Sequence, residues 1–474
     1  MTYDPRPIQL ELGEGFADEV RAASFPNLTL RFRNQRAAET VGLGELDPAA
    51  WERHFARFEP LPNNLPKPLA LRYHGHQFQS YNPQLGDGRG FLFAQLAEQR
   101  TGRILDLATK GSGQTPYSRT ADGRLTLKGG VREILASEML EARGVPTCRT
   151  FSLFETGEAL HRSDEPSPTR ASVLVRLSHS HIRFGSFQRH AHHGDHARVS
   201  KLVEHAVEHH LPEARDARDL PSAFLAAVRD RSADLAAAWM VAGFVHGVLN
   251  TDNMVVTGES FDYGPWRFLP RFDPSFTAAY FDESGLYAYG RQPRAVLWNL
   301  LRLAEALRSL VITSGGRDVV EPIMREFEPR YRERFTARWL ARLGVLSVGA
   351  DQDAMLIGAS VAFLESAPSL PFDQFFHDWF GGSESAARAA SGPFAEQYAA
   401  ASFAPVRRAL EGYAPRSRSM LEHPALRRAT PCSMLIDEVE SIWARIARQD
   451  DWSALEAKVA EIRSVAAPLA SPLP

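Results

Sequence analysis

One short stretch near the middle of the chain constrains the fold more than any other feature. It reads His246-Gly-Val-Leu-Asn-Thr-Asp-Asn253, and Asp262-Tyr-Gly264 follows it. The stretch comes directly after residues 222–244, whose apolar spacing predicts a long helix. Carboxylate and amide side chains are the groups that bind hard divalent cations, and a carboxylate can also accept a proton. The sequence therefore predicts a loop with catalytic residues at the end of a helix.

The spacing resembles a protein-kinase catalytic loop with one part displaced. In kinases His-Arg-Asp is followed after four residues by a metal-binding Asn, and a later Asp-Phe-Gly binds magnesium. Counted from His246, the asparagine falls on Asn253 and the later triplet begins at Asp262, but Val248 occupies the position of the proton acceptor. Asp252 supplies a carboxylate beside the asparagine instead. We expect a site that holds a metal and a nucleotide without phosphorylating in the usual way.

The composition favours a soluble globular enzyme. The chain of 474 residues has a formal net charge of −3, so it lacks the basic surface typical of nucleic-acid-binding proteins. The longest apolar run, Leu235–Val245, is too short for a bilayer core of about 30 Å. Two cysteines form no disulfide framework, and the N-terminus has no signal-peptide pattern. We expect a cytoplasmic monomer without nucleic-acid or membrane partners.

Strand patterns precede helical patterns along the chain. Residues 1–70 predict an N-terminal extension with a short helix near 48–58. Residues 71–190 predict a strand-rich N-lobe, and residues 191–474 a helical C-lobe with a C-terminal extension. The expected fold class is α+β, with the two lobes of a protein-kinase-like fold. The predicted N-lobe strands are 91–96, 104–109, 150–155 and 172–177, with one helix at 131–143. The predicted C-lobe helices are 197–210, 222–244, 293–312, 318–343, 351–365, 384–413 and 434–464.

A glycine-rich segment precedes the first predicted N-lobe strand. It reads Gly86-Asp-Gly-Arg-Gly90. Glycines allow backbone amides to approach a phosphate closely, and Arg89 adds a fixed cation. The alternative is an ordinary hairpin turn, for which Asp-Gly is the commonest signal.

Two further sets of residues are candidates for binding phosphate. Lys110 ends a predicted strand and Glu133 lies in the next helix, which is the order of the kinase Lys–Glu pair, although a surface pair is the alternative. Arg176, near the end of a predicted strand, and Arg183 flank residues 177–182 and can contact phosphate oxygens or form structural salt bridges. Asp122-Gly123 reads as a turn that could line the same pocket.

Histidines are abundant but indicate no catalysis here. His190-Ala-His-His-Gly-Asp-His196 contains no cysteine and has no rigid scaffold, so we predict a solvated loop entering a helix rather than a metal site. His246 at a helix end is expected to pack or hydrogen-bond the loop that follows.

Longer stretches agree with one family pattern from about residue 75 to residue 300. They are Gly75-His-Gln-Phe78, Asn82-Pro-Gln-Leu-Gly-Asp-Gly-Arg89, Lys110-Gly-Ser-Gly-Gln-Thr-Pro-Tyr-Ser-Arg119, Arg132-Glu133, Ser180-His-Ile-Arg-Phe-Gly-Ser-Phe187, His246-Gly-Val-Leu-Asn-Thr-Asp-Asn-Met254, Asp262-Tyr-Gly-Pro265 and Trp298-Asn-Leu300. On these stretches the chain resembles the selenoprotein O family, also known as the YdiU family. Leu127-Lys-Gly-Gly130 departs from the Arg-Ser-Ser/Thr that is more usual there.

The resemblance implies a specific activity. Members have a protein-kinase-like fold, bind ATP in a flipped orientation and transfer AMP to Ser, Thr or Tyr hydroxyls of proteins, releasing pyrophosphate. Uridylylation is also described in the family, and the enzyme itself is a candidate acceptor. Carried over by motif, Asp252 accepts the proton, Asn253 and Asp262 hold Mg²⁺ or Mn²⁺, and Glu133 orients Lys110. The residues expected to bind the nucleotide are Gly86, Gly88, Arg89, Lys110, Asp122, Gly123, Arg176, Arg183 and Asp262.

Two alternatives remain open at this stage. A phosphotransferase with Asp252 as a displaced base would place the γ-phosphate on protein. A non-catalytic scaffold of the pseudokinase type would bind ATP and transfer nothing. The complete set Lys110, Glu133, Asn253 and Asp262 argues against a scaffold, which needs no metal ligands.

Overall fold

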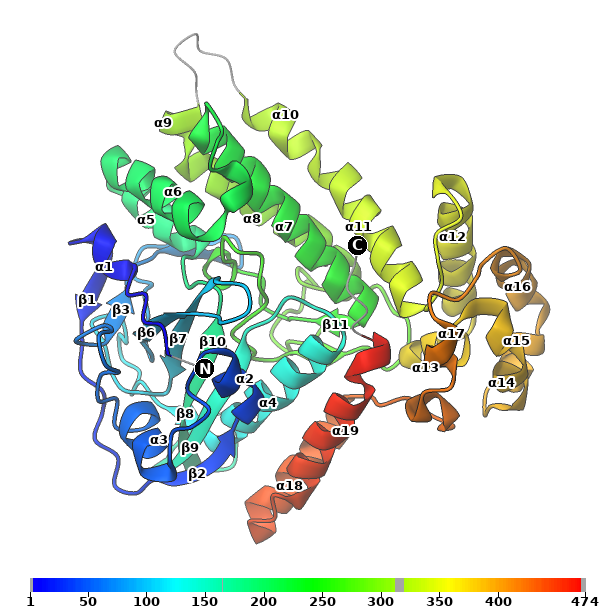
Figure 1. Cartoon of the computed structure of the whole chain (residues 1–474), viewed down its shortest axis with the longest axis horizontal. Helices are drawn as coiled ribbons and strands as arrows, with labels where there is room; N and C mark the ends of the chain where they lie inside the picture. Colours follow the sequence, from blue (N-terminus) through cyan, green and yellow to red (C-terminus); the bar gives the residue numbers. More distant parts are fainter. Residues whose placement is uncertain (1–2, 164, 312–318, 470–474) are drawn as a thin grey trace.

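The computed structural model describes residues 3–163, 165–311 and 319–469 (Figure 1). Its strands are β1 (Ala17–Glu19), β2 (Thr29–Arg33), β3 (Leu69–Leu71), β4 (Gly75–Gln77), β5 (Ser80–Asn82), β6 (Leu92–Ala97), β7 (Ile104–Lys110), β8 (Leu125–Thr126), β9 (Arg149–Leu160), β10 (Thr169–Ser178), β11 (Phe244–Val245) and β12 (Arg267–Phe268). Its α-helices in the first half are α1 (Gln9–Leu12), α2 (Gln35–Thr40), α3 (Pro48–Phe55), α4 (Leu127–Ala142), α5 (Phe184–His192), α6 (His196–His210) and α7 (Leu220–Ala242). Those in the second half are α8 (Gln292–Ala306), α9 (Arg308–Val311), α10 (Val320–Arg325), α11 (Phe327–Arg342), α12 (Ala350–Ser366), α13 (Phe372–Asp378), α14 (Ala386–Ser391), α15 (Ala395–Ala399), α16 (Ala404–Leu410), α17 (Arg418–Leu421), α18 (Ile436–Gln449) and α19 (Ser453–Leu469).

One antiparallel sheet organises the first 180 residues. Within the described part of the chain its order is β1-β3-β6-β7-β10-β9-β2, and β8 also pairs with β10. All four predicted strands are present at this sheet's centre, as β6, β7, β9 and β10. The sheet and the helices that follow confirm a mixed α/β architecture.

The segment expected to be an N-terminal extension is part of this sheet structure. Strands β1 and β2 form its two edges, through pairing with β3 and β9. Helices α2 and α3 cover one face of the sheet, where Trp51 stacks on Phe151 at 5.0 Å between ring centroids. Trp51 also donates its indole N–H to Ser152 Oγ at 3.0 Å. Residues 1–70 therefore complete the sheet on one face and at both edges.

Helix α4 covers the opposite face and begins earlier than predicted. Thr126 caps it by accepting a hydrogen bond from the Gly129 N–H at 3.1 Å, so the helix starts at Leu127 rather than at 131. The second glycine of the pair that obscured this start allows close packing on β9, because a Cβ at Gly130 would lie 2.5 Å from Leu153 Cδ1. The side chains of α4 are buried almost throughout.

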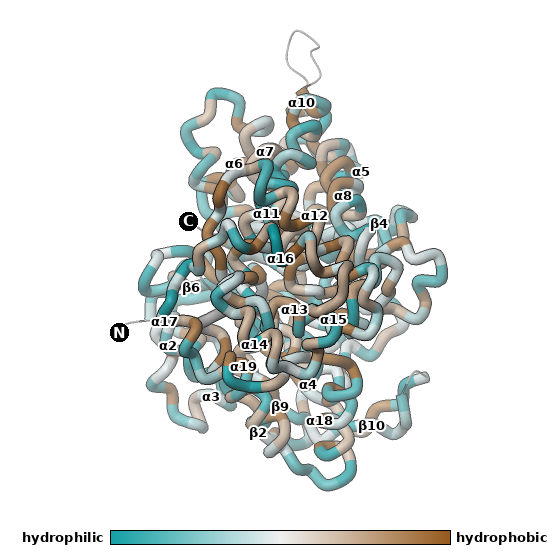
Figure 2. Tube along the Cα trace, turned by 90° about the vertical axis from the view of Figure 1, so that its right-hand side faces the viewer, coloured by the Kyte–Doolittle hydropathy of each residue, from teal (hydrophilic) through white to brown (hydrophobic). Residues whose placement is uncertain are grey.

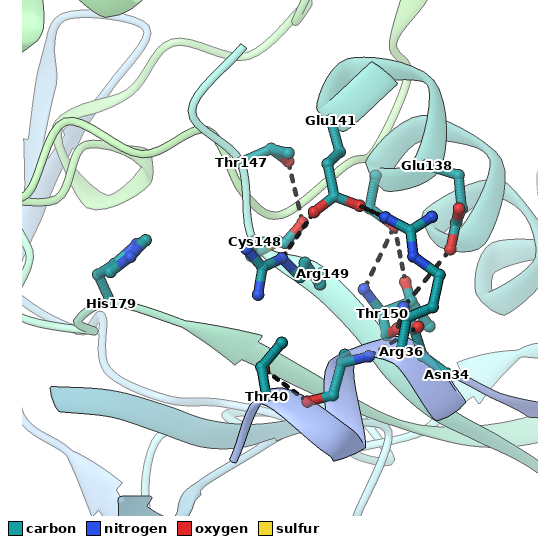
Figure 3. A network of polar contacts seen from close by, with 12 residues as sticks. Asn34, Arg36, Thr40, Glu138, Glu141, Thr147, Cys148, Arg149, Thr150 and His179 are labelled. Carbon is teal, nitrogen blue, oxygen red and sulfur yellow. Dashed lines mark hydrogen bonds and ion pairs between the residues drawn. The ribbon is translucent and has the colours of Figure 1, made fainter. Parts of the chain in front are cut away.

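Buried and partly buried polar contacts fix α4 in place (Figure 3). The Asn34 side chain donates to the Thr150 carbonyl at 3.0 Å, and its Nδ2 lies 3.4 Å from Glu138 Oε1. Arg149 donates to Glu141 at 2.8 Å. From the C-terminal helix α19, Arg463 contacts both oxygens of Glu138, at 2.5 and 2.8 Å. The helix that carries Glu133 is thus held by the sheet on one side and by α19 on the other.

After residue 184 the described chain is mainly helical. The long helix α7 packs against α8 and α11 in the centre of Figure 1. Gly243, in the left-handed region at φ 69°, ends α7, and after β11 comes the stretch of residues 246–253, which we call the catalytic-like loop. No helix among the described residues is long and apolar enough to cross a membrane, and Figure 2 shows hydrophobic residues alternating with hydrophilic ones along the helices.

Several helix predictions in the C-terminal half were wrong in extent. The single helix predicted over 384–413 is α14, α15 and α16, because Gly392-Pro393 and Pro405 interrupt it. The one predicted over 434–464 breaks at Asp450, whose φ is 50°. Segment 293–312 divides into α8 and α9, and segment 318–343 into α10 and α11. The predicted ends at residues 312 and 318 lie outside the described residues.

The histidine-rich loop prediction was also wrong. His190 and His192 belong to helix α5, and only residues 193–195 form the turn before α6. The buried His190 packs on Phe16 at 4.8 Å between ring centroids. The polar residues of α5 obscured its helical periodicity in the sequence. Phe184 and Phe187 lie on the buried face of this helix.

Candidate active site

A cavity of about 290 Å³ lies where the end of β7, the glycine-rich turn before β6 and the segment after the catalytic-like loop meet. Seven of the predicted nucleotide-binding residues line it: Gly86, Gly88, Arg89, Lys110, Arg176, Arg183 and Asp262. The lining has five cationic side chains, with Arg119 as the fifth, against two carboxylates, Asp87 and Asp262. This excess of positive charge suits a polyanion such as a triphosphate.

The glycine-rich turn packs closely against Tyr117 and against the backbone at the end of β7. A Cβ at Gly86 would lie 2.3 Å from the Tyr117 ring, and one at Gly90 would lie 2.1 Å from the Thr109 carbonyl oxygen. The Arg89 carbonyl accepts a hydrogen bond from the Gly111 N–H at 2.7 Å. The glycines are therefore needed for close backbone approach, and the turn forms a wall of the cavity next to the end of β7.

Lys110 lies between two carboxylates. Its Nζ is 2.5 Å from Glu133 Oε1 and 2.5 Å from Asp262 Oδ1. The side chains of Lys110 and Glu133 are 4% and 2% exposed, so their pair is almost fully buried. A buried cation is stable only when it is paired. Glu133, which does not line the cavity, thus fixes the Lys110 side chain, and Lys110 contacts Asp262 on the cavity side.

Asp262 is held ionised by the cations around it. Burial would raise the pKa of this carboxyl, but Lys110, Arg176, Arg89 and Arg183 hold the pKa well below its ordinary value. Its backbone lies in the left-handed region, with φ 63°. This uncommon conformation costs free energy and is a mark of functional sites.

Arg183 connects the cavity to the catalytic-like loop. Its guanidinium donates to the Asp252 carbonyl oxygen at 2.8 Å and to Asp87 Oδ1 at 3.1 Å. It also stacks on the rings of Tyr73 and Phe261, at 4.4 and 4.9 Å from their centroids. These contacts fix the guanidinium in one orientation toward the cavity.

Arg176 presents a hydrogen-bonding group without a partner. Its Nε–H is 3.2 Å from His181 Nε2, while its buried Nη1 has no hydrogen-bond partner and lies 3.6 Å from Asp262 Oδ1. Asp106 accepts from the His181 backbone N–H at 2.9 Å and so positions the ring. A buried donor left unpaired is costly, and an anionic ligand would satisfy it.

Asp252 lies next to the cavity with an unpaired carboxylate oxygen. Burial raises its pKa to about 6, against the lowering effect of Arg183. Its Oδ1 is buried and has no hydrogen-bond partner in the described structure. A Cβ at Gly75 would come within 3.2 Å of this oxygen, so the β4–β5 hairpin packs directly against it. A carboxylate poised near neutral pH suits general base catalysis.

The neighbouring residues of the loop are held by hydrogen bonds. Asn253 donates its amide N–H to the Val248 carbonyl at 2.9 Å, which turns the amide oxygen to the opposite side. His246 is buried, and its Nε2 is 3.0 Å from the Phe261 carbonyl oxygen. This geometry confirms the structural role predicted for His246.

The oxygen atoms present fit a hard divalent cation. Mg²⁺ and Mn²⁺ prefer carboxylate and carbonyl oxygens, and bind through one or two carboxylates together with phosphate oxygens. Asp262 lines the cavity and is ionised, whereas Asn253 and Asp252 are not among the lining residues. Asp252 lies close enough to Asp262 for their charges to interact, and Asn253 follows it directly in the loop. The donor types fit such an ion, with Asp262 as the ligand on the cavity side.

Asp122 and Gly123 do not line the cavity, although their neighbour Ala121 does. Asp122 pairs with Arg162 at 2.9 Å, and Gly123, at φ 69°, packs on the Gly113 backbone. The pair forms a turn beside the cavity.

The residue-by-residue prediction missed several residues of the cavity. Asp87 was overlooked although it lies inside the glycine-rich motif, where its side chain accepts from the Leu71 N–H at 3.0 Å and pairs with Arg183. Arg119 is the last residue of the family-like stretch that begins at Lys110, and its backbone has φ 55°. Tyr73 has no local signal, since an aromatic residue in this sequence context reads as core.

Comparisons with known proteins identify the family of the chain. A family model described as "Protein adenylyltransferase SelO" matches residues 1–463. The chain belongs to the SelO family. A relative from Synechocystis sp. is 48% identical over 357 residues, covering 74% of this chain and 72% of the relative. One from Gloeobacter violaceus is 42% identical over 472 residues, covering 98% and 95%. Both are named "Protein nucleotidyltransferase YdiU". This SelO-family chain is therefore an enzyme of the nucleotidyltransferase class.

Proposed function

We propose that this enzyme transfers AMP from ATP to Ser, Thr or Tyr hydroxyls of proteins in the cytoplasm, acting as a monomer. The observation that carries the proposal is the cation-lined cavity beside Asp252, a carboxylate with one unpaired oxygen. We propose further that residues 71–190, with the sheet edges and covering helices supplied by residues 1–70, and residues 191–474 correspond to the two lobes of a kinase-like fold. The Lys110–Glu133 pair between a sheet and its covering helix supports this assignment.

In the proposed reaction the acceptor hydroxyl gives its proton to Asp252. Its oxygen forms a bond to the α-phosphorus, and the bond from the α-phosphorus to the bridging oxygen of the β-phosphate breaks. Pyrophosphate leaves with the electron pair, so AMP becomes esterified to the protein. The fixed cations Arg176, Arg183 and Lys110 stabilise the charge that develops on the phosphate oxygens. In this arrangement the γ-phosphate lies toward Lys110 and the α-phosphate toward Asp252.

Asn253 and Asp262 would hold Mg²⁺ or Mn²⁺ together with the nucleotide. A bound divalent cation neutralises phosphate charge and orients the leaving group. The contact between Lys110 and Asp262 at 2.5 Å supports a coupled role for these two residues. A metal ion bound to Asp262 and the ammonium group of Lys110 would both neutralise negative charge on the same triphosphate.

The acceptor polypeptide needs a surface next to Asp252. Three exposed aromatic side chains, Phe78 (38% exposed), Tyr280 (84%) and Phe281 (46%), lie in contact there. Asn250 of the catalytic-like loop accepts a hydrogen bond from the Phe78 N–H at 3.1 Å, which holds the group against the loop. Exposed apolar patches of this kind mark interaction sites. The protein substrate is therefore proposed to contact these rings.

The test is transfer of label from α-phosphate-labelled ATP to protein, with Mg²⁺ or Mn²⁺. We expect Asp252→Ala to lose about 10²- to 10⁴-fold in rate. It should still bind ATP, detected as ATP-dependent thermal stabilisation. Asp216→Ala, at an exposed aspartate, is the matched control and should keep full activity. A wild-type rate in Asp252→Ala would refute the assignment of the base. Parallel reactions with UTP test whether uridylylation also occurs.

A further inference from the structure

Three potential metal ligands meet far from the cavity, on the surface between helices α1 and α6. His205 and His209 are four residues apart on α6, so their rings project from the same face, 4.7 Å apart between centroids. Glu11 of α1 lies opposite them. Its Oε2 is 2.7 Å from His209 Nε2 and 3.7 Å from His205 Nδ1. One ligand atom from each side chain lies within 4.8 Å of the other two.

We propose that Glu11, His205 and His209 form a binding site for a divalent transition-metal ion of the zinc class. Two imidazole nitrogens with one carboxylate oxygen is a ligand set that zinc uses, with water in the fourth position. Glu11 is 57% exposed, so solvent has access for that fourth ligand. Nitrogen ligands favour zinc, cobalt, nickel or copper over magnesium, which separates this site from the nucleotide site.

The present side-chain positions need only small movements to bind such an ion. Ligand atoms at about 2.0–2.1 Å from a tetrahedral zinc are separated from one another by about 3.3 Å. The observed separations of 2.7 and 3.7 Å lie on either side of this value. The Glu11 carboxylate, at 57% exposure, is free to rotate toward equal separations, and the ligand atoms of all three side chains already lie within 4.8 Å of one another.

A simple ion pair explains these contacts less completely. Glu11 can pair with a protonated His209, but His205 Nδ1 at 3.7 Å is beyond hydrogen-bond distance. His205 is also only 5% exposed, so solvent offers its ring few alternative partners. One metal ion would satisfy all three side chains.

Both supporting elements are anchored independently of the metal. The α1 segment is held by the Gln9 N–H, which donates to Gln95 Oε1 at 2.7 Å, and by the buried Leu12. Helix α6 is capped by Asp195, which accepts from the Arg198 N–H at 3.0 Å. The ligands thus project from two fixed backbones. A bound ion would connect the first helix of the chain to the helical part of the molecule.

The experiment uses the full chain without an affinity tag or nucleotide, titrated with Co²⁺. We expect one ion per chain at this site, with the intense visible absorption of tetrahedral Co²⁺, displaced by Zn²⁺. His209→Gln and Glu11→Gln should each weaken Co²⁺ affinity at least tenfold. Circular dichroism checks that the variants fold, and the exposed Glu11 makes its variant the safer one.

Two controls locate the ion. His192→Gln alters another group of close histidine rings, formed with His74 and His193, and should leave the tetrahedral signal unchanged. Asp262→Asn removes a ligand of the proposed nucleotide site and should also leave it unchanged. Absence of a tetrahedral Co²⁺ signal would overturn the proposal. So would a signal that survives both His209→Gln and Glu11→Gln, or one that is lost in His192→Gln.

Discussion

Replacement of Asp252 by asparagine should remove activity and at the same time stabilise the ligand-free protein. The pKa of this carboxyl is raised from 3.8 to about 6 by burial, so the folded protein disfavours its charged form. At about 1.4 kcal/mol per pH unit, the shift corresponds to a ceiling of about 3 kcal/mol at neutral pH. Asp252 is half-buried, and solvent screening reduces the expected gain to about 1–2 kcal/mol.

The sign of this effect depends on pH in a defined way. The folded and unfolded carboxyl are both neutral below pH 3.8, so the penalty is absent there. It develops as the pH rises and is complete above about 6. Asp252→Asn should therefore gain more stability over wild type at pH 8 than at pH 5, while label transfer from ATP falls by about 10²- to 10⁴-fold.

Thermal and urea unfolding at both pH values measure the difference. The matched control is Asp282→Asn, since buried Asp282 accepts hydrogen bonds from the N–H groups of Leu286 and Tyr287, both at 2.8 Å. That variant should lose stability by about 1–3 kcal/mol because one acceptor is removed. An Asp252→Asn protein less stable than wild type at pH 8 would refute the reasoning about its environment.

Three further outcomes are expected. The kcat/KM for label transfer should fall about tenfold per pH unit below about pH 6, since only ionised Asp252 accepts a proton, and a flat profile down to pH 5 would contradict this role. Arg463→Met should destabilise the protein by about 1–3 kcal/mol in urea unfolding, because it leaves the buried Glu138 without its cationic partner, although the 27% exposure of Arg463 limits the loss. Phe281→Ala should raise the KM for an acceptor protein without changing ATP binding. Met355→Ala, at a 71% exposed position elsewhere on the surface, should leave that KM unchanged. Equal effects of the two variants would contradict the proposed acceptor surface.

Local patterns predicted the central strands and the pairing of Lys110 with Glu133. Strand β7 ends at Lys110 and Glu133 follows in the next helix, and this order is sufficient to anticipate a pair across a sheet and its covering helix. The spacing from His246 to Asn253 is likewise contained in one short loop. Such features depend on neighbours in sequence, so they can be recognised from sequence alone.

Contacts between distant segments could not be predicted in this way. Arg183 joins Asp87 to the backbone of Asp252, across 96 and 69 residues of chain, and only the folded sheet brings them together. The ion pair between Arg463 and Glu138 joins residues that are 325 positions apart in the sequence. The break at Asp450 also has a tertiary element, since its carboxylate pairs with Arg31 and Arg170 of the sheet.

The measurement that tests the central claim most directly compares ATP labelled at the α-phosphate with ATP labelled at the γ-phosphate. Purified enzyme is incubated with Mg²⁺ or Mn²⁺ and each nucleotide, and label on the enzyme itself and on added protein is followed. The cavity beside Asp252 predicts label from the α-position only, with release of pyrophosphate. Label from the γ-position would contradict nucleotidyl transfer by this site and would show phosphoryl transfer instead.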